Sequence, residues 1–326
     1  MTRATRRRLT VRATLMLGAS AWLATAVAAQ GVRAARPMDA AVVAGDLDAM
    51  ERALYDAVRR SPRDPGARAA LGAWLASRGQ LRSGAVLLEE SRLFGGDATA
   101  IAARLVHVYT WLRDWASLMS LPASPLSPAE KTVIEVLLAR GTTIDGPDST
   151  TVPFAPLEVG ALGRMPMQIG TDTLWVEVDP QTEGLVLPGL GRGAGAVDVL
   201  ADHRGVPIGV VRECAFGALT LRGVPVRVDG TLGVGRARMG FDLFAQLAPT
   251  VDARAGTATL RRGGRVTARD DELALPVLLG FPGVQLVARA GSAPVPIAAP
   301  AGRAALRGRT WSVDLRGGVI WVGATR

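Results

Sequence analysis

Apolar residues recur at intervals of three and four positions between residues 38 and 141, which is the spacing of amphipathic helices. The pattern predicts a helical region in which each helix has one apolar face that only a neighbouring helix can bury. The clearest stripes are Leu47, Met50, Leu54 and Ala57; Leu71, Trp74 and Leu75; and Leu81, Ala85, Leu88 and Leu93.

The helical pattern repeats after 34 residues. Leu47 falls on Leu81 and Leu54 on Leu88, and Gly79 lies between two of the predicted helices. A 34-residue period of paired helices with small residues at their crossing resembles the tetratricopeptide repeat. That resemblance implies a peptide or protein ligand. A spacer or a stabilising cap for the rest of the chain is the alternative.

Two further features extend the helical region. A degenerate third unit lies near residues 99–121. After it, Ser127 and Glu130 form a capping-box pattern with Pro128 at the first helical position, which predicts one more helix to about Arg140.

The pattern changes after Gly141. Residues 142–151 contain the sequence Asp-Gly-Pro-Asp-Ser and are predicted to be a linker. Beyond them, short runs of Val, Leu, Ile and Thr are separated by Gly and Pro, which is typical of an all-β region. These runs are Leu174–Val178, Leu185–Leu187, Ile208–Val211, Leu219–Leu221, Val224–Val228 and Thr257–Leu260.

Five segments between residues 152 and 264 follow one another in the order of a known set of motifs. They are Leu174–Asp179, Glu183–Leu187, Phe216–Val226, Met239–Phe244 and Thr250–Leu260. Through these segments, residues 152–264 resemble the retropepsin-like aspartic peptidases, in particular the exported bacterial ones. The resemblance implies a closed β-barrel, with Asp179 as the candidate catalytic residue at the end of an apolar strand.

The predicted catalytic loop departs from the family pattern. The family has Asp-Thr-Gly or Asp-Ser-Gly, whereas this chain has Asp179, Pro180, Gln181 and Thr182. Aspartic peptidases hold two carboxyl groups so close that they share one proton. Pro180 has neither a hydroxyl nor an N–H, Gln181 has a Cβ where glycine is expected, and Thr182 comes one position late. A β-turn without catalysis and a working variant of the loop are both open, and the turn is favoured.

Residues 272–326 repeat part of this β region. The sequence from Ser312 to Ile320 has the same pattern as Thr250 to Ala258. Aligning the stretch that begins at Val284 with the strand before Asp179 places Ala288 at the aspartate position. We therefore expect a shortened second lobe without a carboxylate, in which case activity would require a homodimer through Asp179. A chance recurrence of a hairpin pattern is the alternative.

Other candidate groups are few. Asp202 and His203 suggest an acid–base pair, but a solvated loop is the simpler interpretation, and His107 and Cys214 are expected to pack inside the protein. Strand alternation places Glu177 on the same face as Asp179. Glu177 could form a carboxyl pair with Asp179 there, or it could be exposed to solvent.

The amino-acid composition excludes several classes of site and partner. The 326 residues include one cysteine and two histidines, which excludes an internal disulfide and a Cys- or His-rich metal centre, and no cofactor is expected. The net charge is +9, but five arginines lie in the first 30 residues, and no basic run with aromatic residues suggests nucleic-acid binding.

The first 30 residues have the pattern of a signal peptide. An arginine-rich segment precedes the apolar run at residues 13–29, which ends in small residues. We expect an exported protein, periplasmic or secreted, without a membrane span after cleavage. An uncleaved anchor is the alternative.

Together these patterns predict helical repeats followed by a retropepsin-like barrel and a possible second lobe. The expected function is binding of a peptide or protein by a peptidase fold that is inactive or weakly active. An active aspartic endopeptidase, working as a homodimer, is the alternative. No metal or cofactor site is predicted.

Overall fold

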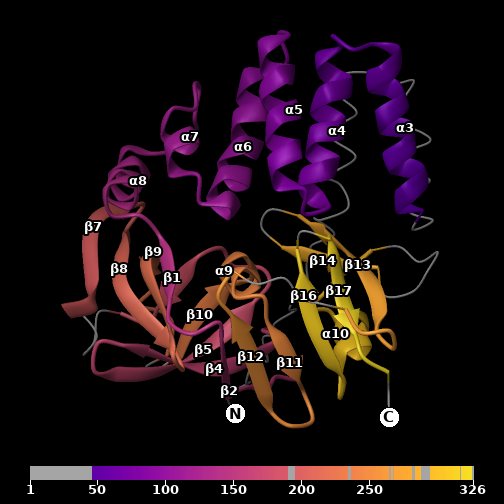
Figure 1. Ribbon diagram of the computed structural model, residues 1–326. Helices are drawn as coiled ribbons and strands as arrows, with labels where there is room; N and C mark the ends of the chain where they lie inside the picture. Colours follow the sequence, from indigo (N-terminus) through magenta and orange to yellow (C-terminus); the bar gives the residue numbers. More distant parts are fainter. Residues whose placement is uncertain are drawn as a thin grey trace, which may run out of the picture.

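The computed structural model describes residues 46–189, 195–233, 236–263, 266, 268–280, 283–287, 294–315 and 317–324. The predicted signal peptide and Ala288 lie outside the described residues. Six helices stand above two β units, which lie side by side (Figure 1). No helix in the described part is long and apolar enough to cross a membrane.

Most helices of the upper layer begin at a side-chain cap. The side chains of Asp46, Asp64, Asp97, Asp114 and Ser127 accept a hydrogen bond from the first helical turn that follows each of them. The capping box predicted at Ser127 is confirmed. The helices are α3 (Leu47–Arg60), α4 (Pro65–Ser77), α5 (Leu81–Leu93), α6 (Ala98–Leu112), α7 (Trp115–Met119) and α8 (Pro128–Arg140).

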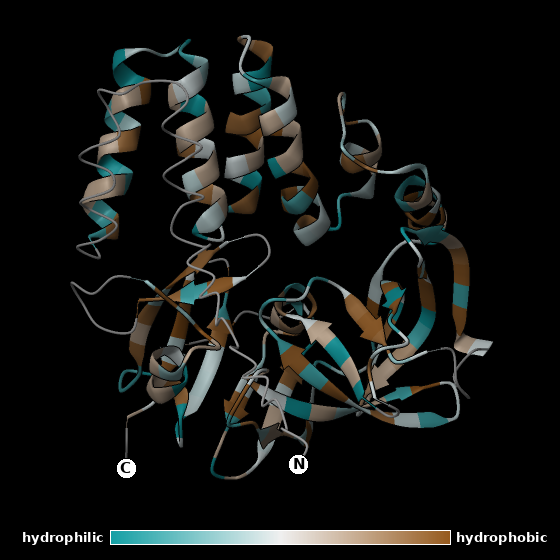
Figure 2. Ribbon diagram, turned by 180° about the vertical axis from the view of Figure 1, so that it is seen from behind, coloured by the Kyte–Doolittle hydropathy of each residue, from teal (hydrophilic) through white to brown (hydrophobic). Residues whose placement is uncertain are grey.

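The 34-residue period appears in the helix starts, because α3 begins at Leu47 and α5 at Leu81. Helices α4 and α5 form a hairpin around Gly79, whose φ is 80°. They cross where Gly72 meets Gly84, and a Cβ on Gly84 would lie 2.7 Å from the carbonyl oxygen of Gly72. The predicted stripes are buried except at Ala57 and Leu81, which are half-buried, and at Leu93, which is 74% exposed at the end of α5. Figure 2 shows the alternation of hydrophobic and hydrophilic residues along these helices.

Six strands close into a barrel. They follow the order β9-β6-β10-β5-β4-β8, and β8 pairs with β9 to complete the circle. Strand β7 (Val197–His203) extends β8, while β1 (Thr143–Asp145) and β3 (Ala155–Pro156) add to β9 and β4. The barrel strands are β4 (Gly163–Ile169), β5 (Asp172–Asp179), β6 (Leu185–Leu187), β8 (Val206–Phe216), β9 (Leu219–Val228) and β10 (Arg236–Gly240).

Two runs predicted as separate strands form the single strand β9. Along one side β8 pairs with its whole length. On the other side β1 pairs with residues 220–222 and β6 with residues 226–228. Gly223 and Pro225 lie in the interval between those two partners, where the missing N–H of proline breaks no ladder on that side. Pro225 therefore lies inside the strand, at a point where only one side of β9 is paired.

The second β unit forms a sheet with the order β15-β14-β13-β17-β16-β11-β12-β2. Helix α9 (Phe241–Gln246) leads from the barrel into it, and α10 (Pro300–Leu306) lies between β15 and β16. The strands are β2 (Ser149–Pro153), β11 (Thr250–Asp252), β12 (Thr257–Arg261), β13 (Leu273–Leu279), β14 (Val284–Leu286), β15 (Val295–Pro296), β16 (Thr310–Asp314) and β17 (Val319–Val322).

Residues 142–151, predicted as a linker, contain β1 and the beginning of β2. The Gly-Pro-Asp part of the segment is the bend between them. Each of these short strands is stabilised by a partner far along the chain, β9 for β1 and β12 for β2, which local composition does not reveal.

The fold class predicted from the sequence, helices followed by a closed β-barrel, is confirmed. The helices also share buried surface with the barrel. Ile208 and Val210 of β8 belong to the same apolar cluster as Leu105 of α6 and Leu137 of α8. Trp111, at the end of α6, is part of the barrel core.

The crossing of α4 and α5 yields a prediction. Gly84→Ala should lower the free energy of unfolding by about 1–3 kcal/mol, because the new methyl group would overlap backbone atoms of α4 that cannot move independently. Ser83→Ala, at an exposed position in the same turn, is the matched control and should leave stability within about 0.5 kcal/mol. Urea unfolding followed by circular dichroism measures both. Equal stability of the two variants would contradict close packing at this crossing.

Candidate functional site

Strand β5 ends at Asp179, and β10 brings a glycine directly beside it. Strand β10 runs parallel to β5 and antiparallel to β6, so it lies between two strands that precede it in the sequence. In this register Gly240 is opposite Asp179. A Cβ on Gly240 would overlap the carbonyl oxygen of Thr182 and the carboxylate of Asp242. Only glycine therefore allows β10 to approach the loop that follows Asp179.

The segment from Asp179 to Thr182 is a β-turn. The Thr182 N–H donates to the Asp179 carbonyl oxygen at 3.1 Å. The Gln181 N–H donates to Oδ1 of Asp179 at 2.9 Å, and the Thr182 hydroxyl donates to Oδ2 at 2.9 Å. Pro180 is buried at the second position of the turn, where its fixed φ is favourable. Each oxygen of the Asp179 carboxylate thus accepts a hydrogen bond from its own turn.

This geometry answers two expectations about the altered loop. The Cβ of Gln181 does not prevent its N–H from reaching the aspartate. The Gln181 side chain turns outward to Gly283 in the loop between β13 and β14, where a Cβ would lie 3.1 Å from Oε1. The late hydroxyl of Thr182 bonds to Asp179 itself rather than to a second loop.

The next residue, Glu183, is held by helix α6. His107 Nδ1 lies 3.0 Å from Glu183 Oε1, and the Trp111 indole N–H donates to the same oxygen at 3.4 Å. The Arg227 side chain donates to the Glu183 carbonyl oxygen at 3.3 Å. His107 was predicted only to pack, and the structure gives it a polar contact with the turn region instead.

Asp242 is the most buried carboxyl group of the region, at 3% exposure. It accepts the Gly184 N–H at 2.9 Å. Burial raises the pKa of Asp242 to about 6, and the charge of Glu183 adds to this effect, against the opposing effects of the Gly184 N–H and the Arg113 guanidinium.

The charge facing Asp242 comes from the end of α6. Arg113 caps that helix in the left-handed conformation, with a φ of 54°, and its side chain hydrogen-bonds to Gln246 of α9. Burial lowers the pKa of Arg113 to about 10. Sequence reasoning missed both residues. Asp242 is the one acid inside the apolar run Phe-Asp-Leu-Phe, which is the signal that could have identified it.

The remaining candidate site residues form structural contacts. Glu177 forms an ion pair with Arg236 at 3.2 Å. Asp202 accepts the Gly205 N–H at 2.7 Å, and His203 contacts the Ser127 hydroxyl at 2.9 Å, so the two do not act as an acid–base pair.

Cys214 is buried as predicted, and burial raises the pKa of its thiol to about 12.

Among the described residues, no group of three or more His, Cys, Asp or Glu side chains is arranged to hold a metal ion.

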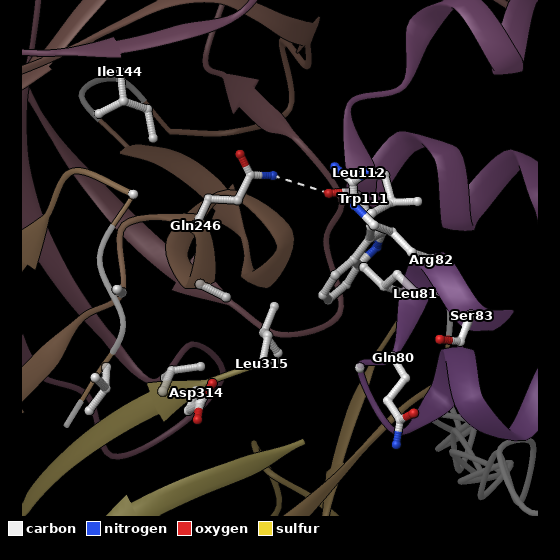
Figure 3. A pocket seen from close by; sticks show the side chains of 16 residues that line it. Gln80, Leu81, Arg82, Ser83, Trp111, Leu112, Ile144, Gln246, Asp314 and Leu315 are labelled. Carbon is white, nitrogen blue, oxygen red and sulfur yellow. Dashed lines mark hydrogen bonds between the residues drawn. The ribbon is translucent and has the colours of Figure 1, made fainter. Parts of the chain in front are cut away.

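A cleft of about 650 Å³ lies where the α4–α5 turn, the end of α6, α9 and the end of β16 meet (Figure 3). Leu81, Trp111 and Leu315 contribute apolar surface to it. Its polar groups include Gln80, Arg82, Ser83, Gln246 and Asp314. Asp179 is not among the lining residues, so the cleft and the Asp179 turn are separate features.

Comparison with known proteins shows a structural likeness but no similar sequence family. No family model matches the chain, and no curated protein matches it. Among solved structures it is similar to a retropepsin-like aspartic protease from Rickettsia conorii, with 10% sequence identity and a TM-score of 0.26. The match covers 37% of this chain and 94% of that chain. At this identity the likeness concerns the fold alone.

The buried carboxyl group predicts a pH dependence of stability. The folded-state pKa of Asp242, about 6, lies above the unfolded value of about 3.9, so the folded state binds more protons between these values. Stability contributed by the neutral form is complete below about pH 4 and is lost as the pH rises to about 6. Asp242→Asn should remove this loss, which amounts to about 2–3 kcal/mol.

Urea unfolding of both proteins from pH 4 to 7 measures the effect. The Asp242→Asn variant should gain stability relative to the original chain as the pH rises. Asp148→Asn, which changes a carboxyl group that is 97% exposed, should show the same pH profile as the original chain. A constant difference between the original chain and Asp242→Asn would contradict the raised pKa.

Proposed function

We propose that this chain is an exported peptide- or protein-binding module built on a retropepsin-like barrel that does not cleave its ligand. The observation that carries the proposal is the Asp179 turn. Both carboxylate oxygens accept hydrogen bonds from Gln181 and Thr182, so the side chain acts as the first residue of a β-turn.

Acid–base hydrolysis at Asp179 would require a second carboxyl group close enough to share its proton. The acidic residues that lie nearest to Asp179 in the sequence, or on the neighbouring strand and helix, do not supply this second carboxyl group. Glu177 pairs with Arg236, Glu183 contacts α6, and Asp242 is buried against the Gly184 N–H. A single carboxylate held by its own turn supports binding or scaffolding rather than cleavage.

The cleft beside α9 is the proposed binding site. Ligand sites in proteins are typically concave, a few hundred to a thousand Å³ in volume, and mainly apolar with a few polar groups, and they occur preferentially between structural units. The cleft meets each of these conditions. Its amide and hydroxyl groups, on Gln80 and Ser83, can hydrogen-bond to the backbone of an extended peptide, while Leu81 and Leu315 can accept an apolar side chain.

The absence of catalysis is tested with a denatured protein as substrate. The complete exported chain, incubated between pH 3 and 7, should yield no more cleavage than its Asp179→Asn variant. Asp179→Asn changes one acceptor in the turn and should leave the protein folded, as circular dichroism would verify. Cleavage by the original chain that disappears in Asp179→Asn would overturn the proposal and establish the endopeptidase.

Binding is tested separately at the cleft. Ser83 is exposed and lines the cleft, so Ser83→Trp should fill part of it and weaken binding of a fluorescent-labelled, unfolded casein by about tenfold or more. Val86→Trp is the matched control, because Val86 is 58% exposed on the same helix but does not line the cleft. Fluorescence anisotropy measures both variants. Equal affinity of the two would refute the cleft as the peptide site.

A further inference from the structure

The two hairpins that meet in the middle of the second sheet have the same internal register. Thr250, Val251 and Asp252 of β11 pair with Thr259, Ala258 and Thr257 of β12. Ser312, Val313 and Asp314 of β16 pair with Trp321, Ile320 and Val319 of β17. Every residue of the second hairpin is thus 62 positions after its counterpart.

Details of the turns repeat as well. Asp252 accepts the Ala255 N–H at 2.9 Å, and Asp314 accepts the Gly317 N–H at 3.0 Å. The next residue in each turn is a glycine with positive φ, 66° at Gly256 and 62° at Gly318. The Gly256 carbonyl oxygen accepts a hydrogen bond from the Phe154 N–H at 2.8 Å, and the Gly318 carbonyl oxygen accepts one from the Val277 N–H at 2.8 Å.

Those last bonds identify a third pair of counterparts, β2 and β13. Strand β2 pairs with β12 so that Pro153 faces Thr257, and β13 pairs with β17 so that Pro276 faces Val319. Six consecutive strands of the sheet, in the order β2-β12-β11-β16-β17-β13, therefore consist of two copies of one three-stranded unit.

The two units are related by a local two-fold axis. Strands β11 and β16 are antiparallel, and Thr250 pairs with its own counterpart Ser312, their hydroxyl oxygens 2.8 Å apart. A residue that faces its own copy is the mark of an isologous contact, which is the contact that two identical subunits form across a two-fold axis.

The same comparison identifies the counterpart of Asp179. In the barrel, Met165 of β4 pairs with Val176 of β5, three residues before Asp179. In the second unit, Leu286 of β14 pairs with Val295 of β15, three residues before Ala298. Val178 and Ile297, the residues preceding Asp179 and Ala298, are both fully buried. The alignment from sequence alone had placed Ala288 here, and the strand pairing moves the position to Ala298.

Both of these segments contact the opposite unit. The side chain of Gln181 lies against Gly283, in the loop between β13 and β14. Arg303 of α10, which follows Ala298, donates to the carbonyl oxygens of Leu157 and Ala161 in the loop between β3 and β4. The loops contacted are themselves counterparts, so the contacts are reciprocal, as a two-fold relation requires.

We infer that residues 273–324 are a reduced second copy of the barrel unit, which occupies the place of a second subunit and presents Ala298 where that subunit would present an aspartate. The copy is reduced because α10 begins two residues after Ala298, whereas β6 to β10 lie between Asp179 and α9. With the hydrogen-bonding edge of β11 already paired to β16, another chain cannot add there. The inference rests on strand pairing and is independent of the proposed peptide binding.

Cysteine cross-linking across the axis tests the pairing. Facing residues of an antiparallel pair have Cα atoms within the range that a disulfide spans. Oxidation of Thr250→Cys/Ser312→Cys should give a cross-linked product of one-chain mass on a non-reducing gel. Thr151→Cys/Thr259→Cys, a facing pair on β2 and β12, is the control and should cross-link within one chain in any case.

The outcome that overturns the inference is a cross-linked dimer from the Thr250/Ser312 variant while the control stays at one-chain mass. Light scattering after size-exclusion chromatography measures the molar mass of the unaltered chain, so this result does not depend on any substitution. One-chain mass agrees with the inference, and a stable two-chain mass contradicts it. Neither result depends on whether a peptide binds or is cleaved.

A third measurement addresses the position of Ala298. At neutral pH, Ala298→Asp should lower the urea midpoint, and this shift should be smaller in an Asp179→Asn background, because two like charges then no longer oppose each other. Ala288→Asp, the position expected from sequence alone, should shift the midpoint equally in both backgrounds. Additive effects at Ala298, or coupling at Ala288 instead, would overturn the assignment.

Discussion

The pairing of β11 with β16 determines how the β units and the helices are arranged. It joins the last hairpin of the chain, β16 and β17, to the β11–β12 hairpin, which follows the barrel through α9, in one sheet. As a result, the turn between β16 and β17 lies under the α4–α5 turn, where Gly79 and Gly318 allow the two backbones to touch. The cleft beside α9 exists because these turns and α9 meet without filling the space between them. Without this strand pairing, the helices would have only one β unit to rest on.

The Asp179 turn shows how a loop at the end of a buried strand can remain folded through its own residues. Burying a strand end requires partners for its polar groups. Here the Gln181 N–H and the Thr182 hydroxyl satisfy the carboxylate locally, so the loop needs no matching loop from another chain. The outer side of the loop is then free to contact other elements, and Glu183 binds α6. One loop therefore supplies the hydrogen bonds of the Asp179 carboxylate and also holds the helices through Glu183.

The sequence predicted features that depend on neighbouring residues. Helix periodicity, the capping box at Ser127, the turn at Asp179 and the repeat of the 250–258 pattern at residues 312–320 all follow from the local sequence. The structure agrees with the predicted helices and turns. Features that depend on distant partners were missed. Asp242 is buried facing Arg113, which lies on another element, and β1 exists only because β9 lies beside it. The alignment that placed Ala288 at the aspartate position rests on a repeat pattern, from which strand lengths and inserted loops cannot be read.

The position of α6 argues that the helical region and the barrel form one functional unit. Three residues near the end of α6 contact the barrel or α9: His107 and Trp111 contact Glu183, and Arg113 contacts Gln246 and faces Asp242. A charged side chain buried beside an acid is costly to separate, because each group would be left without its compensating charge. A freely hinged spacer would not carry such groups at its boundary. The helices therefore form a fixed wall of the cleft, and the contacts of α6 with Glu183 and Gln246 hold that wall against the β units.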